Sequence, residues 1–216
     1  MGHQSKTVRR SIPVLKRHRF SREPKRRFTL FCEGKRTEPA YFNALKRAYP
    51  SALIDVIIHP GVGVPFTIAK KAVEFARHSR PKKDSFEKHD QVWAVFDRDQ
   101  HPRFQESVAL CGTHGIKVAR SNPCFEVWLI LHEQDYNKPN HRRAVQRDLQ
   151  KLRPEYDKKS SKTPYCYELV SQVRDAEQRA EKQLKHREQG GDPYGNPSTT
   201  VGRLCRAIRE AHQKAS

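Results

Sequence analysis

Several features that would place a protein in a membrane or a secretory pathway are missing from this 216-residue chain. It has no run of about 18 apolar residues, so we expect no membrane-spanning helix. Its basic N-terminal segment lacks the apolar core of a secretory signal. Its five cysteines are an odd number without a C-x-x-C pair, which argues against a disulfide framework and a zinc site. We therefore expect a protein of the reducing cytoplasm.

Acidic residues are scarce. The chain has 43 Lys and Arg against 24 Asp and Glu, a formal net charge of +19. Residues 1–27 hold ten basic residues and one acid, a net +9, so +10 remains for the other 189 residues. We interpret residues 1–27 as a flexible basic arm. The charge predicts a polyanionic partner, nucleic acid above all, although a merely soluble basic protein is the alternative.

The first half of the chain alternates strand-like and helix-like patterns. Apolar runs rich in β-branched and aromatic residues predict four strands: 28–32, 53–59, 90–96 and 116–119. Amphipathic segments between them predict helices near 39–48, 65–78 and 103–113. This order predicts an α/β core over residues 28–120, with a four-stranded, mostly parallel sheet covered by helices on both faces.

The second half, residues 121–216, predicts a mainly helical layer. Asn122 is placed to cap a helix carrying Phe125 to His132, and Ser198 to cap the last helix. Further helices are expected near 142–152 and 164–187, and residues 190–195 form a turn-rich loop.

Two acidic clusters follow strand-like runs. Glu33 comes directly after residues 28–32, and Asp97 and Asp99 come after residues 90–96. Ligands of open α/β sheets gather at the carboxyl ends of the strands, so these acids are expected to converge there. Alternating residues of an extended chain point the same way, which turns Arg98 toward the sheet edge or a phosphate. Carboxylate oxygens suit Mg²⁺ or Mn²⁺; the alternative is a loop acid and a solvated turn.

Three blocks of this sequence resemble the RloB-like family: Cys32–Phe42 (CEGKRTEPAYF), Val92–His101 (VWAVFDRDQH) and Ser121–His132 (SNPCFEVWLILH). Asn196–Thr199 before the last helix is similar too. The resemblance implies one Toprim-like domain over residues 28–216, related to topoisomerases, primases and OLD-type nucleases. It also implies a Mg²⁺-dependent nuclease of bacterial defence, often found with an ATPase partner. This chain has no Walker A pattern, so ATP hydrolysis would belong to that partner.

The resemblance also assigns roles to the acids. Glu33 matches the Toprim acid, a general acid/base or metal ligand, and Asp97 and Asp99 match the metal-binding pair. Glu126 is a fourth catalytic candidate that completes a second metal site or orients a water; otherwise it is a plain first-turn helix acid. Glu38 either supports the site or is a favourable charge at a helix N-terminus.

Basic and polar residues complete the candidates. Lys35 and Arg36 follow Glu33 and are placed to clamp a phosphate. Lys158 and Lys159 form a second basic loop that either binds a nucleic-acid backbone or is simply solvated. His132 is either a general acid or a core histidine. The other polar candidates are His101, Ser121 and Asn122.

We therefore expect a Mg²⁺- or Mn²⁺-dependent nuclease acting as a defence effector, with DNA, RNA and tRNA all open as substrates. The alternative from another class is a non-catalytic nucleic-acid-binding or scaffold subunit of an ATPase complex. A primase-like nucleotidyl transferase is a third option, because Toprim sites serve that chemistry too.

Overall fold

The computed structural model describes residues 26–50, 54–78, 90–98, 101–156 and 165–215. Its strands are β1 (Arg26–Cys32), β2 (Ile54–His59), β3 (Gln91–Asp97), β4 (Lys117–Asn122) and β5 (Ser198–Thr199). They form one sheet in the order β2-β1-β3-β4-β5, in which the first four strands are parallel and β5 is antiparallel to β4. The predicted α/β class with a mostly parallel sheet is confirmed. The predicted number of four strands was wrong, since the described residues contain five.

Eight helices lie within the described residues. They are α1 (Thr37–Ala48), α2 (Pro65–His78), α3 (Phe104–Thr113), α4 (Glu126–Glu133), α5 (Arg142–Leu152), α6 (Tyr165–Ser171), α7 (Val173–Gln189) and α8 (Val201–Ala215). The helix predicted over 164–187 is two helices, with Gln172 between them donating its N–H to the Leu169 carbonyl. None of the helices in this described part is long and apolar enough to cross a membrane.

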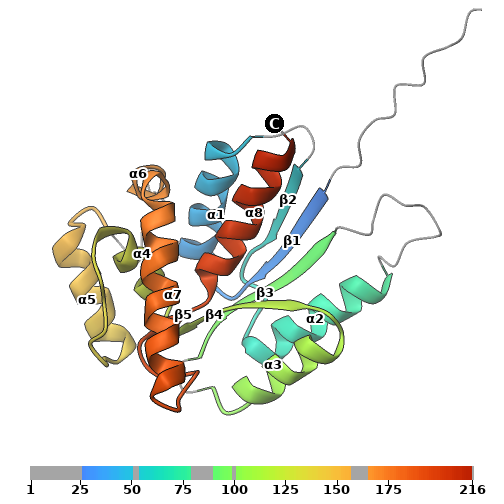
Figure 1. Cartoon of the computed structure of the whole chain (residues 1–216). Coiled ribbons are helices and arrows are strands. Elements are labelled where there is room, and N and C mark those ends of the chain that lie inside the picture. The colour runs from blue at the N-terminus through green and yellow to red at the C-terminus, as the bar shows by residue number, and fades with distance from the viewer. Residues whose placement is uncertain (1–25, 51–53, 79–89, 99–100, 157–164, 216) are drawn as a thin grey trace, which may run out of the picture.

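The sheet is covered on both faces, and strand alternation decides which side chains each face buries. Along β3, Trp93 and Val95 belong to one apolar cluster, whereas Ala94 and Phe96 belong to the other. This is the period of two that a pleated strand imposes. Helices α1 and α8 lie on one face, and α2 and α3 on the opposite face (Figure 1). Burial on both sides explains the apolar runs of the two central strands, FTLFC in β1 and VWAVF in β3.

The fifth strand is formed where a helix cap was expected. Ser198 pairs with Asn122 in the antiparallel ladder, so it does not cap α8. Thr199 Oγ1 instead accepts the backbone N–H of Val201 at 3.2 Å, and the Thr200 N–H donates to the Arg120 carbonyl at 2.8 Å. A two-residue strand has too short an alternation to be recognised in a sequence.

Two residues that the sequence analysis assigned to the basic arm belong to the sheet instead. Arg26 and Arg27 are the first residues of β1 and pair with Ile54 and Asp55 of β2. Arg27 also lies 3.7 Å from the Asp55 carboxylate, a counter-charge that favours its place in the ladder. Residues 1–25 lie outside the described residues.

Candidate active site at the carboxyl ends of β1 and β3

Glu33 and Asp97 lie side by side at the carboxyl edge of the sheet. Strands β1 and β3 are parallel neighbours with Cys32 in register with Val95, and the Glu33 N–H donates to the Val95 carbonyl at 3.0 Å. The Glu33 carboxylate then accepts the backbone N–H of Asp97 at Oε2, at 3.1 Å. The backbone at the end of β3 therefore holds the Glu33 carboxylate, which follows β1, in place. The expected convergence of these two acids is observed.

The Asp97 side chain is nearly buried and is paired with a cation from the helical half of the chain. Its Oδ2 accepts a hydrogen bond from Arg142 Nη2 at 2.7 Å. Burial raises the pKa of Asp97 well above its usual range, and the nearby charges of Glu38, Glu33 and Glu126 add to the rise, whereas Arg142 opposes it. The carboxylate is thus held among other acids, with one guanidinium as the counter-charge.

Glu38, in the first turn of α1, points back into the same site. Its Oε1 accepts the Gly34 N–H at 3.0 Å, and the residue is only 6% exposed. Burial raises its pKa to about 7, repulsion by Glu126 and Glu33 adds to the rise, and the backbone hydrogen bonds lower it. A Cβ at Gly34 would lie 1.8 Å from Glu38 Oε2, so a larger residue there would force the Glu38 carboxylate to move. Glu38 is therefore an acid in the first turn of α1 that also lines the cavity, and its support of a site stays a prediction.

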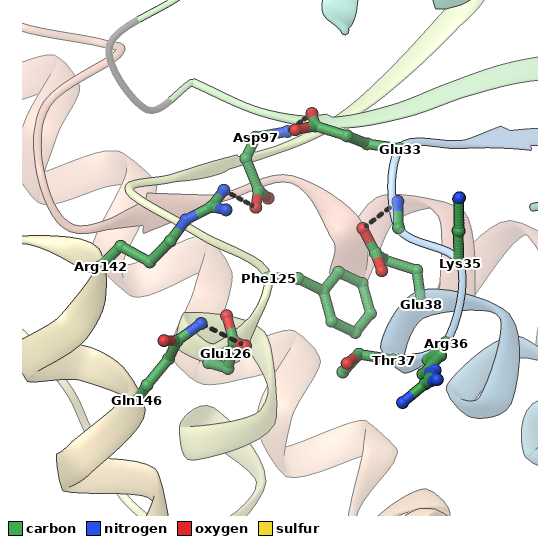
Figure 2. Close-up of a pocket in the computed structure, with 11 residues that line it drawn as sticks. Glu33, Lys35, Arg36, Thr37, Glu38, Asp97, Phe125, Glu126, Arg142 and Gln146 are labelled. Atoms are coloured by element: carbon green, nitrogen blue, oxygen red, sulfur yellow. Dashed lines mark hydrogen bonds and ion pairs between the residues drawn. The ribbon is translucent and has the colours of Figure 1, made fainter. Parts of the chain in front are cut away.

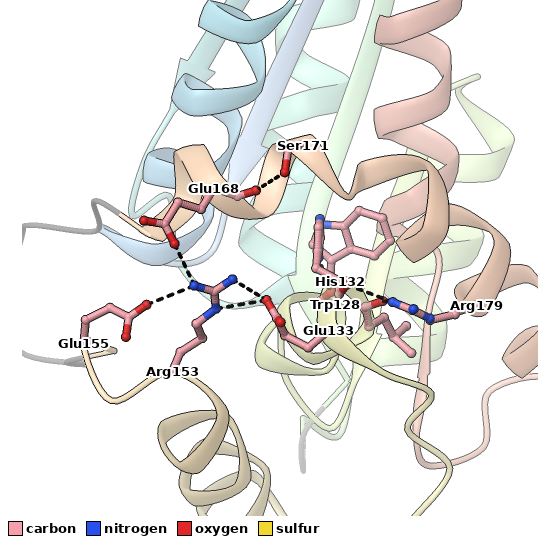
Figure 3. Close-up of polar contacts among 9 residues, drawn as sticks. Trp128, His132, Glu133, Arg153, Glu155, Glu168, Ser171 and Arg179 are labelled. Carbon is pink, nitrogen blue, oxygen red and sulfur yellow. Dashed lines mark hydrogen bonds and ion pairs between the residues drawn. The ribbon is translucent and has the colours of Figure 1, made fainter.

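Glu126 is the first residue of α4 and is also buried. Its Oε1 accepts hydrogen bonds from Tyr156 Oη at 2.6 Å and from Gln146 Nε2 at 3.0 Å. The Tyr156 segment is held by Arg153, which pairs with Glu133 on α4, with Glu168 on α6 and with Glu155 (Figure 3). This ionic network joins three parts of the helical layer beside the site.

These acids surround a cavity of about 220 Å³ (Figure 2). Its lining combines four carboxylates with three cations and a few neutral residues: Glu33, Gly34, Lys35, Arg36, Thr37, Glu38, Asp97, Phe125, Glu126, Arg142 and Gln146. Lys35 and Arg36 belong to the segment that leads from β1 into α1, and their contact with a phosphate stays a prediction. Sequence reasoning missed Arg142, Gln146 and Tyr156, for which only the basic and polar character of the segment 142–156 gave a signal.

The cavity offers carboxylate oxygens, the kind of donor expected for Mg²⁺ or Mn²⁺. Carboxylate oxygens are the ligands these ions prefer. Burial raises the pKa values of Asp97 and Glu38, and the charges of the neighbouring acids add to the rise, so a cation bound there would favour the ionised forms. As placed, however, no three His, Cys, Asp or Glu side chains among the described residues could together hold a metal ion. Asp99, the third predicted ligand, lies outside the described residues, so the metal site stays a prediction.

Three other candidates lie along the turn near Tyr194. Arg98 Nη1 donates to the Tyr194 carbonyl at 2.5 Å, and Arg98 is not among the residues that line the cavity. Asn122 Nδ2 donates to the same carbonyl at 2.7 Å. The predicted cap by Asn122 was wrong: it ends β4, and α4 begins four residues later at Glu126. Ser121 is buried and shares a hydrogen bond with Thr199 Oγ1.

The two candidate histidines differ in position. His101 Nε2 lies 3.5 Å from Glu33 Oε1, with 30% of its side chain exposed. His132 lies in the core near Trp128 (Figure 3), whose carbonyl contacts its Nδ1 at 2.9 Å, while the Tyr41 hydroxyl contacts its Nε2 at 3.0 Å. Burial lowers the pKa of His132 to about 3. Of the two readings, the structure supports the core histidine. Lys158 and Lys159 lie outside the described residues.

Comparison with protein families and known proteins gives one match. A family model described as RloB-like protein matches residues 28–208. Searches of curated proteins and of solved structures each gave no match. The matched span contains Glu33, Glu38, Asp97, Glu126 and Arg142, so the whole cavity belongs to the family region.

Proposed function

The chain belongs to the RloB-like family, and from this premise we propose that it is a Toprim-like, Mg²⁺-dependent nuclease. In this proposal it cleaves phosphodiester bonds of DNA or RNA, tRNA included, as the effector of a bacterial defence module with an ATPase partner. A net charge of +19 favours a polyanionic substrate.

The observation that carries the proposal is the pairing of Glu33 with Asp97 at two neighbouring strand ends. Glu33 accepts the Asp97 N–H at 3.1 Å, and the buried acids Glu38 and Glu126 line the same cavity. A purely structural role does not explain why several acids are buried together in a strongly basic protein, because each buried carboxylate costs desolvation energy. A site for a cationic cofactor explains why they are kept together.

Each residue then has a chemical task. Glu33 and Asp97, with Asp99 as the predicted third acid, would hold the divalent cation. That cation supplies Lewis-acid activation of the phosphodiester and of a water molecule. Glu38, with a pKa of about 7, can hold or release a proton near neutral pH. Lys35 and Arg36, on the cavity lining, can contact phosphate oxygens and stabilise their developing charge.

The test uses purified protein with DNA, total RNA and tRNA, in Mg²⁺ or Mn²⁺ and in EDTA. Cleavage that needs the metal and is lost in Glu33→Gln and Asp97→Asn is the expected result. Glu106→Gln is the matched control, because it removes the same charge at an exposed residue of α3. Cleavage that persists in a Glu33→Gln, Asp97→Asn double variant would refute the proposal. If the protein alone is inactive, co-expression with a candidate ATPase partner tests whether that partner is needed for cleavage.

A non-catalytic nucleic-acid-binding or scaffold subunit is the second candidate. The ion pair between Arg142 and Asp97 favours it, because the pair already supplies a counter-charge for Asp97 without any metal. Under this alternative, EDTA leaves nucleic-acid affinity unchanged and divalent cations do not stabilise the fold. Metal-dependent stabilisation that requires Glu33 and Asp97 would exclude it.

A further inference from the structure

Helix α5 presents two adjacent rows of side chains, one to the cavity and one to solvent. Arg142 and Gln146, four residues apart, both line the cavity, and Figure 2 shows them reaching into it from the same helix. Arg143 and Arg147 are the next residues along the chain and are both exposed. Because residues four apart share a helix face, these two arginines form a row beside the cavity-lining row.

The exposed row, Arg143 and Arg147, carries positive charge that no nearby acid in the described residues neutralises. Helix α5 carries Arg142, Arg143, Arg147 and Lys151 against a single acid, Asp148. Asp148 faces Lys151 at 3.8 Å and accepts a hydrogen bond from Tyr136. Arg142 is paired with Asp97. Among the described residues, Arg143 and Arg147 have no ion pair. A row of free guanidinium groups beside a candidate phosphodiesterase cavity is suited to a phosphate backbone.

The acids of the cavity are recessed from the surface. Asp97, Glu38 and Glu126 are each only 6–7% exposed, and the Glu33 side chain is 19% exposed. A phosphate fixed in a rigid double helix is poorly placed to reach acids recessed in this way. A single strand can reach them, because its backbone bends freely and its nucleotides can be splayed out.

We propose that α5 is the wall along which a single-stranded nucleic acid approaches the cavity, with Arg143 and Arg147 contacting its phosphates. This inference rests on the proposed function, which supplies the reaction, and adds which nucleic acid is bound. The expected substrate is single-stranded DNA or RNA, including the unpaired loops of a folded RNA.

Binding of the full-length protein to a labelled single-stranded oligonucleotide and to its duplex is measured by fluorescence anisotropy. The buffer contains EDTA, so that cleavage does not interfere, and the salt concentration is varied. The variant is Arg143→Gln with Arg147→Gln. The matched control is Lys70→Gln with Lys71→Gln, which removes two exposed positive charges from α2 on the opposite face of the sheet. The basic arm is present in every protein and contributes equally.

The α5 variant is expected to bind the single strand more weakly, with the slope of log affinity against log salt reduced by about 1.4, or about 0.7 for each lost phosphate contact. Its duplex affinity should fall less, and the α2 control should change neither. An unchanged slope in the α5 variant, an equal loss for duplex, or an equal loss in the control would overturn the proposal. So would a loss of binding to phosphatidylserine vesicles without any loss for oligonucleotides. Because the assay measures binding and not cleavage, its result can be interpreted even if the protein is not a nuclease.

Discussion

Arg142 donates from Nη2 to Asp97 Oδ2 at 2.7 Å, across 45 residues of sequence. The guanidinium comes from the first residue of α5, and the carboxylate is the last residue of β3. The helical layer therefore does more than cover the sheet. It supplies the counter-charge of a strand-end acid and closes one side of the cavity.

Removing this guanidinium should destabilise the fold. Arg142→Gln leaves the nearly buried Asp97 carboxylate among other acids, so we expect a loss of about 2 kcal/mol in the free energy of unfolding at pH 8, between the values for surface and buried pairs. Urea unfolding measures it. Adding Asp97→Asn should recover most of the loss. Arg103→Gln is the control, because Arg103 also pairs at 2.7 Å, with Glu106, but at an exposed site; it should cost less than about 1 kcal/mol.

Sequence reasoning located the strand-end acids but not their partners. Glu33 and Asp97 follow apolar runs, and the parallel order of strands brings such ends together whatever the side chains are. Tyr156 and Gln146 reach Glu126 across 30 and 20 residues. Such contacts depend on how the helices pack on one another, which no local pattern records. The cap expected from Asn122 failed for a similar reason, since a partner strand 76 positions later takes that residue into the sheet.

Gly34→Ala should displace Glu38. The added Cβ would meet the Glu38 carboxylate, so the side chain must turn away and lose its hydrogen bond from the Gly34 N–H. We expect a loss of about 1–3 kcal/mol, the cost of disrupting a buried polar contact. Thermal unfolding near pH 5 measures it. Gly112→Ala is the control, because a Cβ there meets nothing within 4 Å, and within a helix alanine should be neutral or stabilising. Equal effects of the two substitutions would contradict the close contact between Gly34 and the Glu38 carboxylate.

The raised pKa of Glu38 predicts that stability falls as pH rises. The folded protein holds this proton up to a pKa of about 7, whereas the ordinary value is 4.5. The folded state therefore binds more protons between these values, and the contribution of the neutral acid, on the order of 3 kcal/mol, is lost as pH rises from about 4.5 through about 7.

Glu38→Gln keeps an oxygen for the Gly34 N–H and removes the titration. Urea unfolding across this pH range should give a flatter stability profile for this variant than for the wild type. Glu106→Gln should leave the profile between pH 5 and 8 unchanged, because hydrogen bonding by Arg103 lowers the pKa of Glu106. A wild-type slope in Glu38→Gln would show that another group binds the proton.

Divalent cations should stabilise the folded protein, and more at pH 8 than at pH 5. With a pKa of about 7, Glu38 is ionised at pH 8 and keeps its proton at pH 5, so a bound cation has one more negative charge of the site to offset at the higher pH. A ligand that binds only the folded state at 100 times its Kd adds about 2.7 kcal/mol of stability.

Thermal unfolding in MgCl₂ or MnCl₂, against NaCl of equal ionic strength, measures the shift in Tm. Glu33→Gln and Asp97→Asn should each abolish most of it, whereas Glu106→Gln should not. A shift that survives both site substitutions would place the cation elsewhere, and no shift in the wild type would favour the scaffold alternative, in which Arg142 alone balances Asp97.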